Sequence, residues 1–259
     1  MKRLQFTYMC LLMSVYAYCQ NPLVKDVGMS DPHIRVYNDT LYLYCGHDSH
    51  PDDPTWVMKE WRVFESTDCW AGDAATRNGQ YYFYFSDRKR GIGVMKSDSP
   101  AGPFKDALGE ALVSPLHDPT ILIDDDPDQT PYIIYGDKSD SYYLARLNED
   151  MISLAESPRP VVIEGEEWEK APEWMDKNYL FKYRGTYFLS WGRDYATSTN
   201  IYGPYTCRGS LGQGHHLDEF AHGSFFWWKG QFYHSWCYYI RDDYKYRESG
   251  ERLCAFRDR

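Results

Sequence analysis

The chain has 259 residues, of which 17% are aromatic, and a formal net charge of −10. This length fits one large all-β domain or two smaller domains, and the evenly spaced repeats described below favour one. The acidic balance argues against a nucleic-acid partner, because no basic stripe is present to replace the counterions of a phosphate backbone.

The N-terminus has the pattern of a secretory signal peptide. Met1, Lys2 and Arg3 precede an apolar run over 4–19 that is too short to span a bilayer comfortably and has small residues near its end. We expect cleavage after Ala17 or Cys19, with an uncleaved anchor as the alternative. The domain prediction is therefore a signal peptide over 1–19 and one domain over 20–259. We expect the mature protein to be secreted or periplasmic, with no stable membrane span.

Five segments repeat one pattern, in which a short aromatic strand, a polar or glycine-bearing turn and a second aromatic strand follow one another. The segments are 35–46, 74–87, 120–137, 179–192 and 224–237. Aligning Tyr42, Tyr82, Tyr132, Tyr187 and Phe232 gives steps of 40, 50, 55 and 45 residues, the size of one propeller blade. A single hairpin cannot bury a face, so the units must stack around an axis. The sequence predicts an all-β, five-bladed β-propeller.

The C-terminal stretch after Tyr239 is charged and loses the aromatic alternation of the repeats. The fifth blade therefore has two or three evident strands, which predicts an incomplete last blade. We expect either that segment 21–28 completes the ring or that the natural chain continues beyond this sequence.

Three carboxylates and one imidazole stand at matching places in the repeats. Asp31, Asp118, Asp176 and His222 each precede a hairpin turn by about eight or nine residues. Because the innermost strand of each propeller blade runs along the central axis, these side chains should meet at one mouth of the channel. The alternative for any one Asp is that it caps a turn. Asp31 and Asp118 both precede a proline, which favours extended backbone and would aim both side chains alike.

Convergent carboxylates suit glycoside hydrolysis, because their mutual repulsion separates their pKa values. One carboxylic acid can then protonate the leaving oxygen while a carboxylate activates water or attacks carbon. The segments SDPHIRVYNDTLYLYCG, WAGDAATRNGQYYFYFSD, GIGVMKSDSPAGPF, HDPTILIDDD and HGSFFWWKGQFY together resemble glycoside hydrolase family 43, a family of five-bladed propellers. The likeness runs from about Asp26 to about Tyr239. It implies that Asp31 is the general base and Asp118 the residue that orients and tunes the acid.

The resemblance also implies residues that contact the substrate. Trp70 and Asp73, both in CWAGDA, and His222 are expected to line the sugar pocket. His222 matches a histidine through which many family members hold a cation or water cluster, so one calcium ion in the central channel is a further expectation. Calcium prefers oxygen ligands, and a buried core histidine is the alternative reading of His222. No organic cofactor is implied.

The general acid is where the sequence departs from the family pattern. The family usually carries a Glu at the position held here by Asp176, whose carboxylate reaches less far because it is one methylene shorter. Glu173 lies three residues upstream and could replace it. Both stay candidates for the acid, and a third alternative is that the acid is missing.

The functional prediction is an inverting glycosidase of the α-L-arabinofuranosidase or β-xylosidase type. Its partners would be oligosaccharides or polysaccharides of plant type that contain arabinose, xylose or galactose. The alternative is a glycan-binding propeller with impaired catalysis, which the replacement of Glu by Asp176 favours.

Overall fold

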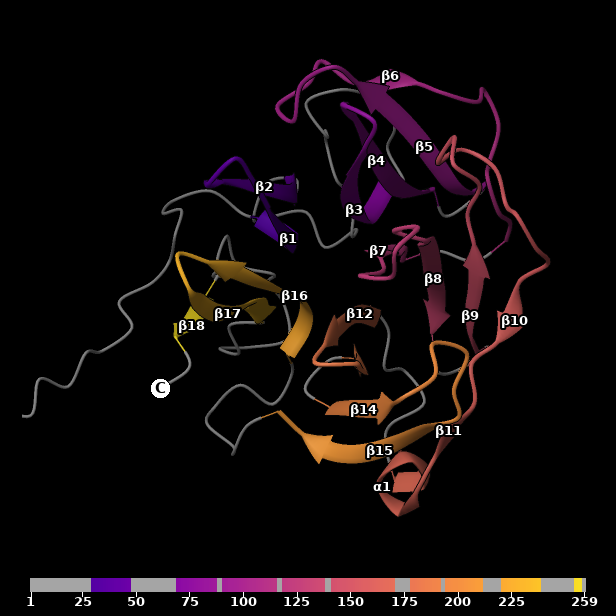
Figure 1. Cartoon of the computed structure of the whole chain (residues 1–259), viewed down its shortest axis with the longest axis vertical. Coiled ribbons are helices and arrows are strands. Elements are labelled where there is room, and N and C mark those ends of the chain that lie inside the picture. The colour runs from indigo at the N-terminus through magenta and orange to yellow at the C-terminus, as the bar shows by residue number, and fades with distance from the viewer. Residues whose placement is uncertain are drawn as a thin grey trace, which may run out of the picture.

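The computed structural model describes residues 29–47, 69–87, 90–115, 118–137, 141–170, 178–191, 194–211, 220–238 and 254–257. These residues form five separate sheets that surround a common centre (Figure 1). Each sheet begins with a strand at the centre and adds strands outward, all of them antiparallel except the outermost strand of one sheet.

The sheets are five blades in chain order. Blade one contains β1 (Met29–Tyr37) and β2 (Thr40–His47). Blade two contains β3 (Cys69–Arg77), β4 (Gln80–Asp87), β5 (Gly91–Ser97) and β6 (Lys105–Asp106). Blade three contains β7 (Thr120–Ile123), β8 (Pro131–Asp137), β9 (Ser141–Arg146) and β10 (Arg159–Pro160). Blade four contains β12 (Asn178–Tyr183), β13 (Thr186–Trp191), β14 (Asp194–Ser198), β15 (Tyr205–Ser210) and β11 (Ile163–Glu164), which pairs with β15 in parallel. Blade five contains β16 (Phe220–Trp228), β17 (Gln231–Tyr238) and β18 (Cys254–Arg257).

The first two strands of every blade are the hairpin that the repeat predicts. In four of them the turn is formed by two residues with positive φ: Asn38 and Asp39, Asn78 and Gly79, Arg184 and Gly185, Lys229 and Gly230. Such turns match the right-handed twist of antiparallel strands. The hairpin of blade three has a longer acidic turn between β7 and β8.

The innermost strands form a complete ring. Each of the strands β1, β3, β7, β12 and β16 contacts the next, and β16 contacts β1. This ring and the sheet order confirm the predicted five-bladed, all-β propeller. Blade five has three strands among the described residues, because β18 from the charged C-terminal stretch pairs with β17. The segment 21–28, predicted as one way to complete the ring, lies outside the described residues.

Apolar side chains gather between neighbouring blades, as the marginal stability of a lone hairpin requires. One cluster joins blades three and four around Leu144, Leu189 and Trp191, and a second joins blades two and three around Tyr84 and Ile133. Between blades four and five the packing is aromatic, with the rings of Phe181 and Phe225 4.8 Å apart. The aromatic richness of the chain is therefore largely explained by packing between blades.

The one helix in the described part of the chain is α1 (Glu166–Lys170), which has five residues. No helix among those residues is long and apolar enough to cross a membrane.

A histidine between the aromatic rings of blade five predicts acid sensitivity. His234 is partly buried and stacks on Phe225, with ring centroids 4.1 Å apart. Burial disfavours the imidazolium and lowers the pKa of His234 from 6.5 to about 3. Between those two values the unfolded chain binds the additional proton, so the free energy of unfolding falls as pH falls through 6.5.

After a discount for partial exposure, we expect this histidine to cost about 1–2 kcal/mol of stability between pH 7 and pH 4.5. Urea unfolding at the two pH values measures the loss in the wild-type protein and in His234→Phe, which keeps the ring stack. The variant should lose less stability than the wild type. An equal loss in both proteins would assign the acid sensitivity to other groups.

Candidate active site

The innermost strands share an irregularity near their N-terminal ends. The pairing register shifts by one residue in β1, β3 and β16, at positions that include Asp31, Ala71 and His222 respectively. Such β-bulges bend a strand and re-aim side chains, and they are frequent beside active sites. In β3 and β16 pairing resumes at a glycine, Gly72 or Gly223. At both glycines a Cβ would meet the carbonyl oxygen of the neighbouring strand at 2.5 Å or less.

Asp118 lies two residues before β7, next to the bulge of blade two. Its side chain is 2% exposed and its φ is 59°, a left-handed conformation that few residues other than glycine adopt. Its backbone N–H donates to Ser86 Oγ at 2.7 Å, and Ser86 Oγ donates to the carbonyl of Ala71 at 2.8 Å. The Asp118 carbonyl accepts from Asn178 Nδ2 at 2.9 Å. Asp118 is therefore fixed between blades two and four.

The structure thus brings several predicted site positions to the starts of the innermost strands. Asp31 and His222 lie at bulges, Trp70 lies directly before one, and Asp118 adjoins the bulge of blade two. The side chains of Asp31, Trp70 and His222 lie outside the described part of the chain, as do Asp176 and Glu173 entirely. The roles predicted for these five residues stay predictions.

Asp73, predicted to bind substrate, lies at the junction of three innermost strands. It is fully buried, and its Oδ1 accepts from Arg35 Nε at 3.0 Å and from the Ala74 N–H at 2.7 Å. Its Oδ2 accepts from Arg35 Nη2 and from the Ile121 N–H, the latter at 2.8 Å. Arg35 Nη2 also donates to the Ile121 carbonyl at 2.9 Å. Both carboxylate oxygens are thus engaged in joining β1, β3 and β7, which gives Asp73 a structural role, and its predicted contact with substrate stays a prediction.

The ion pair with Asp73 favours the charged form of Arg35. Burial disfavours the charged guanidinium, but the adjacent Asp73 carboxylate, together with Tyr179 and Tyr37, outweighs that effect and raises the pKa of Arg35 above its ordinary value. Arg35 therefore remains charged throughout the working pH range of a protein.

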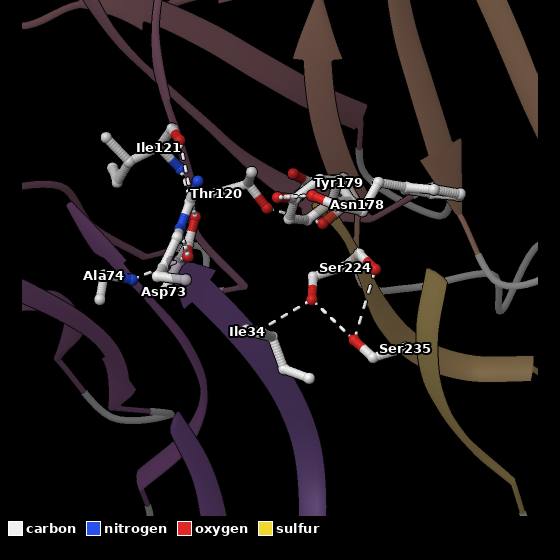
Figure 2. Close-up of polar contacts among 11 residues, drawn as sticks. Ile34, Asp73, Ala74, Thr120, Ile121, Asn178, Tyr179, Ser224 and Ser235 are labelled. Carbon is white, nitrogen blue, oxygen red and sulfur yellow. Dashed lines mark hydrogen bonds and ion pairs between the residues drawn. The ribbon is translucent and has the colours of Figure 1, made fainter. Parts of the chain in front are cut away.

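A hydrogen-bonded contact crosses every junction between neighbouring innermost strands, and we call this set the polar belt. Figure 2 shows part of it around the channel. The five contacts are Arg35 to Asp73 (β1–β3), the Ile121 N–H to Asp73 Oδ2 (β3–β7), Thr120 Oγ1 to the Asn178 carbonyl (β7–β12), Tyr179 OH to the Phe225 carbonyl (β12–β16) and the Ile34 N–H to Ser224 Oγ (β16–β1). The belt fixes each blade relative to its neighbours along the propeller axis. It therefore also fixes the positions of the predicted site residues along that axis.

A cavity of about 690 Å³ opens at the other end of the channel. Its lining comes from the middle and C-terminal parts of the innermost strands and from the hairpin turns, and it includes Tyr37, Asn78 and Trp227 together with the belt residues Ile121 and Tyr179. Asp118 and Ser86 are not among the residues that line this cavity.

Among the described side chains, no cluster of three or more His, Cys, Asp or Glu could hold a metal ion. The acidic run at the turn of blade three is occupied by protein contacts: Asp124 accepts from Lys182 Nζ at 2.6 Å and from Tyr187 OH at 2.5 Å. The side chain of His222, on which the calcium prediction rests, is outside the described residues. The described residues thus include no set of ligands for the ion.

Sequence reasoning missed three residues that shape this site: Arg35, Ser86 and Asn178. Ser86 carries one local signal, since it is the small polar residue that ends the aromatic run QYYFYF of β4. Asn178 and Arg35 carry none, because their partners are 60 and 38 residues away along the chain.

Known proteins share both the sequence and the fold. The sequence profile of the Glycosyl hydrolases family 43 matches residues 49–209, more than half of the chain. A xylosidase/arabinosidase of Bacteroides ovatus is 27% identical over an alignment of 260 positions, and the alignment covers 73% of this chain and 79% of that protein. A beta-D-galactofuranosidase of Aspergillus niger is 28% identical over an alignment of 216 positions, which covers 68% of this chain and 63% of that protein.

Solved structures give the same result. The crystal structure of a family 43 enzyme from Xanthomonas citri, complexed with xylotriose, superposes with a TM-score of 0.73 and 26% sequence identity. The match covers 92% of this chain and 88% of that one. The family profile covers more than half of the chain and the five blades agree with it, and the chain belongs to glycoside hydrolase family 43.

Proposed function

We propose that this protein hydrolyses O-glycosidic bonds of plant-type glycans with inversion of configuration at the anomeric carbon. The observation that carries the proposal is the position of Asp118, fixed in a strained conformation at the start of β7, beside the bulge of blade two and tied to the start of β12. Strained backbone conformations of this kind cluster at functional sites.

In the proposed reaction, Asp31 removes a proton from a water molecule as that water attacks one face of the anomeric carbon. A carboxylic acid on the other face protonates the departing glycosidic oxygen, so that no alkoxide has to leave. Inversion requires the two carboxyl groups to lie about 6.5–9.5 Å apart, which leaves room for the water. Asp118 orients the acid and raises its pKa through its negative charge, which keeps the acid protonated near neutral pH.

Asp176 and Glu173 remain the two candidates for the acid. Asn178, which donates to the Asp118 carbonyl, lies two residues after Asp176. Two residues of chain span at most about 7 Å, so the contact of Asn178 with Asp118 supports an acid close to Asp118. Asp176 fits this limit better, whereas Glu173 supplies the longer side chain that is usual in the family.

The substrate class is supported by relatives with similar sequences. They include a xylosidase/arabinosidase and a beta-D-galactofuranosidase, and a structural neighbour was solved with xylotriose. We therefore include xylose-, arabinose- and galactose-containing oligosaccharides in the proposal, with Trp70 and His222 lining the sugar pocket. Calcium in the channel near His222 belongs to the proposal only through the sequence resemblance. Metal analysis of the purified protein after dialysis tests it.

Secretion also belongs to the proposal. It is supported by the positive residues at the N-terminus and the apolar run over 4–19, and by the fact that plant polysaccharides are too large to enter a cell intact. The proposed processing removes residues 1–19 and leaves one catalytic domain over 20–259. Sequencing the N-terminus of the exported protein tests the cleavage position.

A panel of nitrophenyl glycosides tests the activity and the sugar together. We expect release of nitrophenol from a xyloside, an arabinofuranoside or a galactofuranoside. Proton NMR of the first product formed should show the inverted anomer. Binding of xylo-oligosaccharides without turnover on any member of the panel would contradict hydrolysis and support a glycan-binding propeller.

A further inference from the structure

The backbone of Asp118 needs support that its own sequence does not give. A left-handed conformation costs a non-glycine residue about 1–2 kcal/mol, although Asp tolerates it better than most. Pro119 follows and would favour extended backbone at Asp118, which is not the conformation observed. Contacts from other parts of the fold must therefore hold this conformation.

Blade two supplies the first contact through Ser86. Ser86 is fully buried, and its single hydroxyl accepts from the Asp118 N–H at 2.7 Å, while its proton is directed to the Ala71 carbonyl at 2.8 Å and, at the longer distance of 3.4 Å, to Asp118 Oδ1. Ala71 is the extra residue of the bulge in β3, and Ser86 pairs with Trp70 beside it. One hydroxyl thus connects the backbone of Asp118 to the bulge that follows Trp70.

Blade four supplies the second contact through Asn178, which is also fully buried. Its Nδ2 donates to the Asp118 carbonyl at 2.9 Å, and its own carbonyl accepts from Thr120 Oγ1 at 2.7 Å. The amide N–H and the carbonyl of Asp118 are therefore held from two different blades. Because Asn178 begins β12, the same contact connects Asp118 to the segment that contains both candidates for the acid.

We propose that Ser86 and Asn178 are positioning residues that clamp the backbone of Asp118 and so fix its carboxylate relative to the general acid. This inference rests on the proposed function, in which Asp118 orients and tunes that acid. Neither residue is required to touch the sugar. Their effect on the reaction is exerted through Asp118.

Ser86→Ala tests the clamp, with Ser190→Ala as the matched control. Ser190 is also a buried serine within a strand, and its hydroxyl donates to the Tyr179 carbonyl at 3.5 Å. For Ser86→Ala we expect kcat on a natural xylo- or arabino-oligosaccharide to fall roughly 10- to 100-fold, with a much smaller change in KM. The loss on a nitrophenyl glycoside should be smaller, because nitrophenol leaves with little help from an acid.

The pH profile separates positioning from a general loss of stability. A displaced Asp118 carboxylate raises the pKa of the acid less, so the alkaline limb of kcat/KM should move to lower pH in Ser86→Ala. In Ser190→Ala the alkaline limb of kcat/KM should stay at the pH of the wild type. Equal kcat values and equal alkaline limbs in the two variants would overturn the clamp. Asn178→Ala repeats the test from blade four and decides it when Ser86→Ala does not fold.

A measurement that does not depend on enzymatic activity distinguishes failure of the clamp from failure of the proposed function. Hydrogen exchange of the Asp118 amide should be at least 10-fold faster in Ser86→Ala than in wild type or in Ser190→Ala, because its acceptor is removed. An unchanged exchange rate would contradict the clamp. Wild-type protein that is inactive on every glycoside would instead refute the proposed function, and the exchange rates would then decide the clamp alone.

Discussion

Asp31→Ala should reduce kcat on every accepted glycoside by roughly 10³-fold. A positioned general base contributes about 10²–10⁴-fold to a rate, and water without its base is a poor nucleophile at neutral pH. The loss should be similar for nitrophenyl and natural substrates, because Asp31 acts on the water and not on the leaving group. Steady-state kinetics on both kinds of substrate measure the effect.

Two control variants sharpen this prediction. Glu110→Ala removes an exposed carboxylate on blade two and should keep the wild-type rate. Asp31→Asn preserves the size of the side chain but cannot accept the proton, so it should be as inactive as Asp31→Ala. Wild-type turnover in Asp31→Asn would remove Asp31 from the mechanism, whatever the activity of the remaining protein.

Asp73→Ala should destabilise the folded protein by about 2–3 kcal/mol, because it leaves the partly buried guanidinium of Arg35, whose side chain is 23% exposed, without its counter-charge. The same change deprives the Ile121 N–H of its acceptor, and thereby breaks two of the five contacts in the polar belt. Urea unfolding followed by tryptophan fluorescence measures the loss. We expect a lower midpoint for Asp73→Ala than for any single substitution on the surface.

The pair between Arg77 and Glu149 provides the matched control. Its contact from Nε to Oε2 is 2.8 Å, but the Glu149 side chain is 72% exposed. Glu149→Ala should therefore cost no more than about 1 kcal/mol. Replacing Arg35 and Asp73 together by Met and Leu should recover much of the loss, because no unpaired charge remains buried. Equal costs for Asp73→Ala and Glu149→Ala would show that the belt does not hold the blades together.

The repeat pattern was sufficient to predict the architecture. Hairpin turns such as Asn78–Gly79 and the aromatic strands beside them are local features, and each one recurred where the period placed it. The position of Asp118 two residues before β7 agrees with counting back from its hairpin turn, although the innermost strands differ in length, with nine residues in β1, β3 and β16, six in β12 and four in β7.

The local shape of the site could not be predicted in this way. A bulge such as that at Ala71 depends on the register between two strands, which no residue type specifies alone. Asp73 lies in a segment typical of the family, yet its carboxylate forms an ion pair with Arg35 from another blade. Ser86 and Asn178 likewise act across blade boundaries, where side-chain packing decides the contacts.

The central claim is that the innermost strands gather residues from different blades around one mouth of the channel to cleave a glycoside. A crystal structure of Asp31→Asn with a bound xylo-oligosaccharide tests it most directly. We predict the anomeric carbon between residues 31 and 176 or 173, with Asp118 beside the acid and with carboxyl groups about 6.5–9.5 Å apart. A sugar bound instead in the cavity lined by Tyr37, Asn78 and Trp227, with residues 31 and 118 at opposite ends of the channel, would contradict the account.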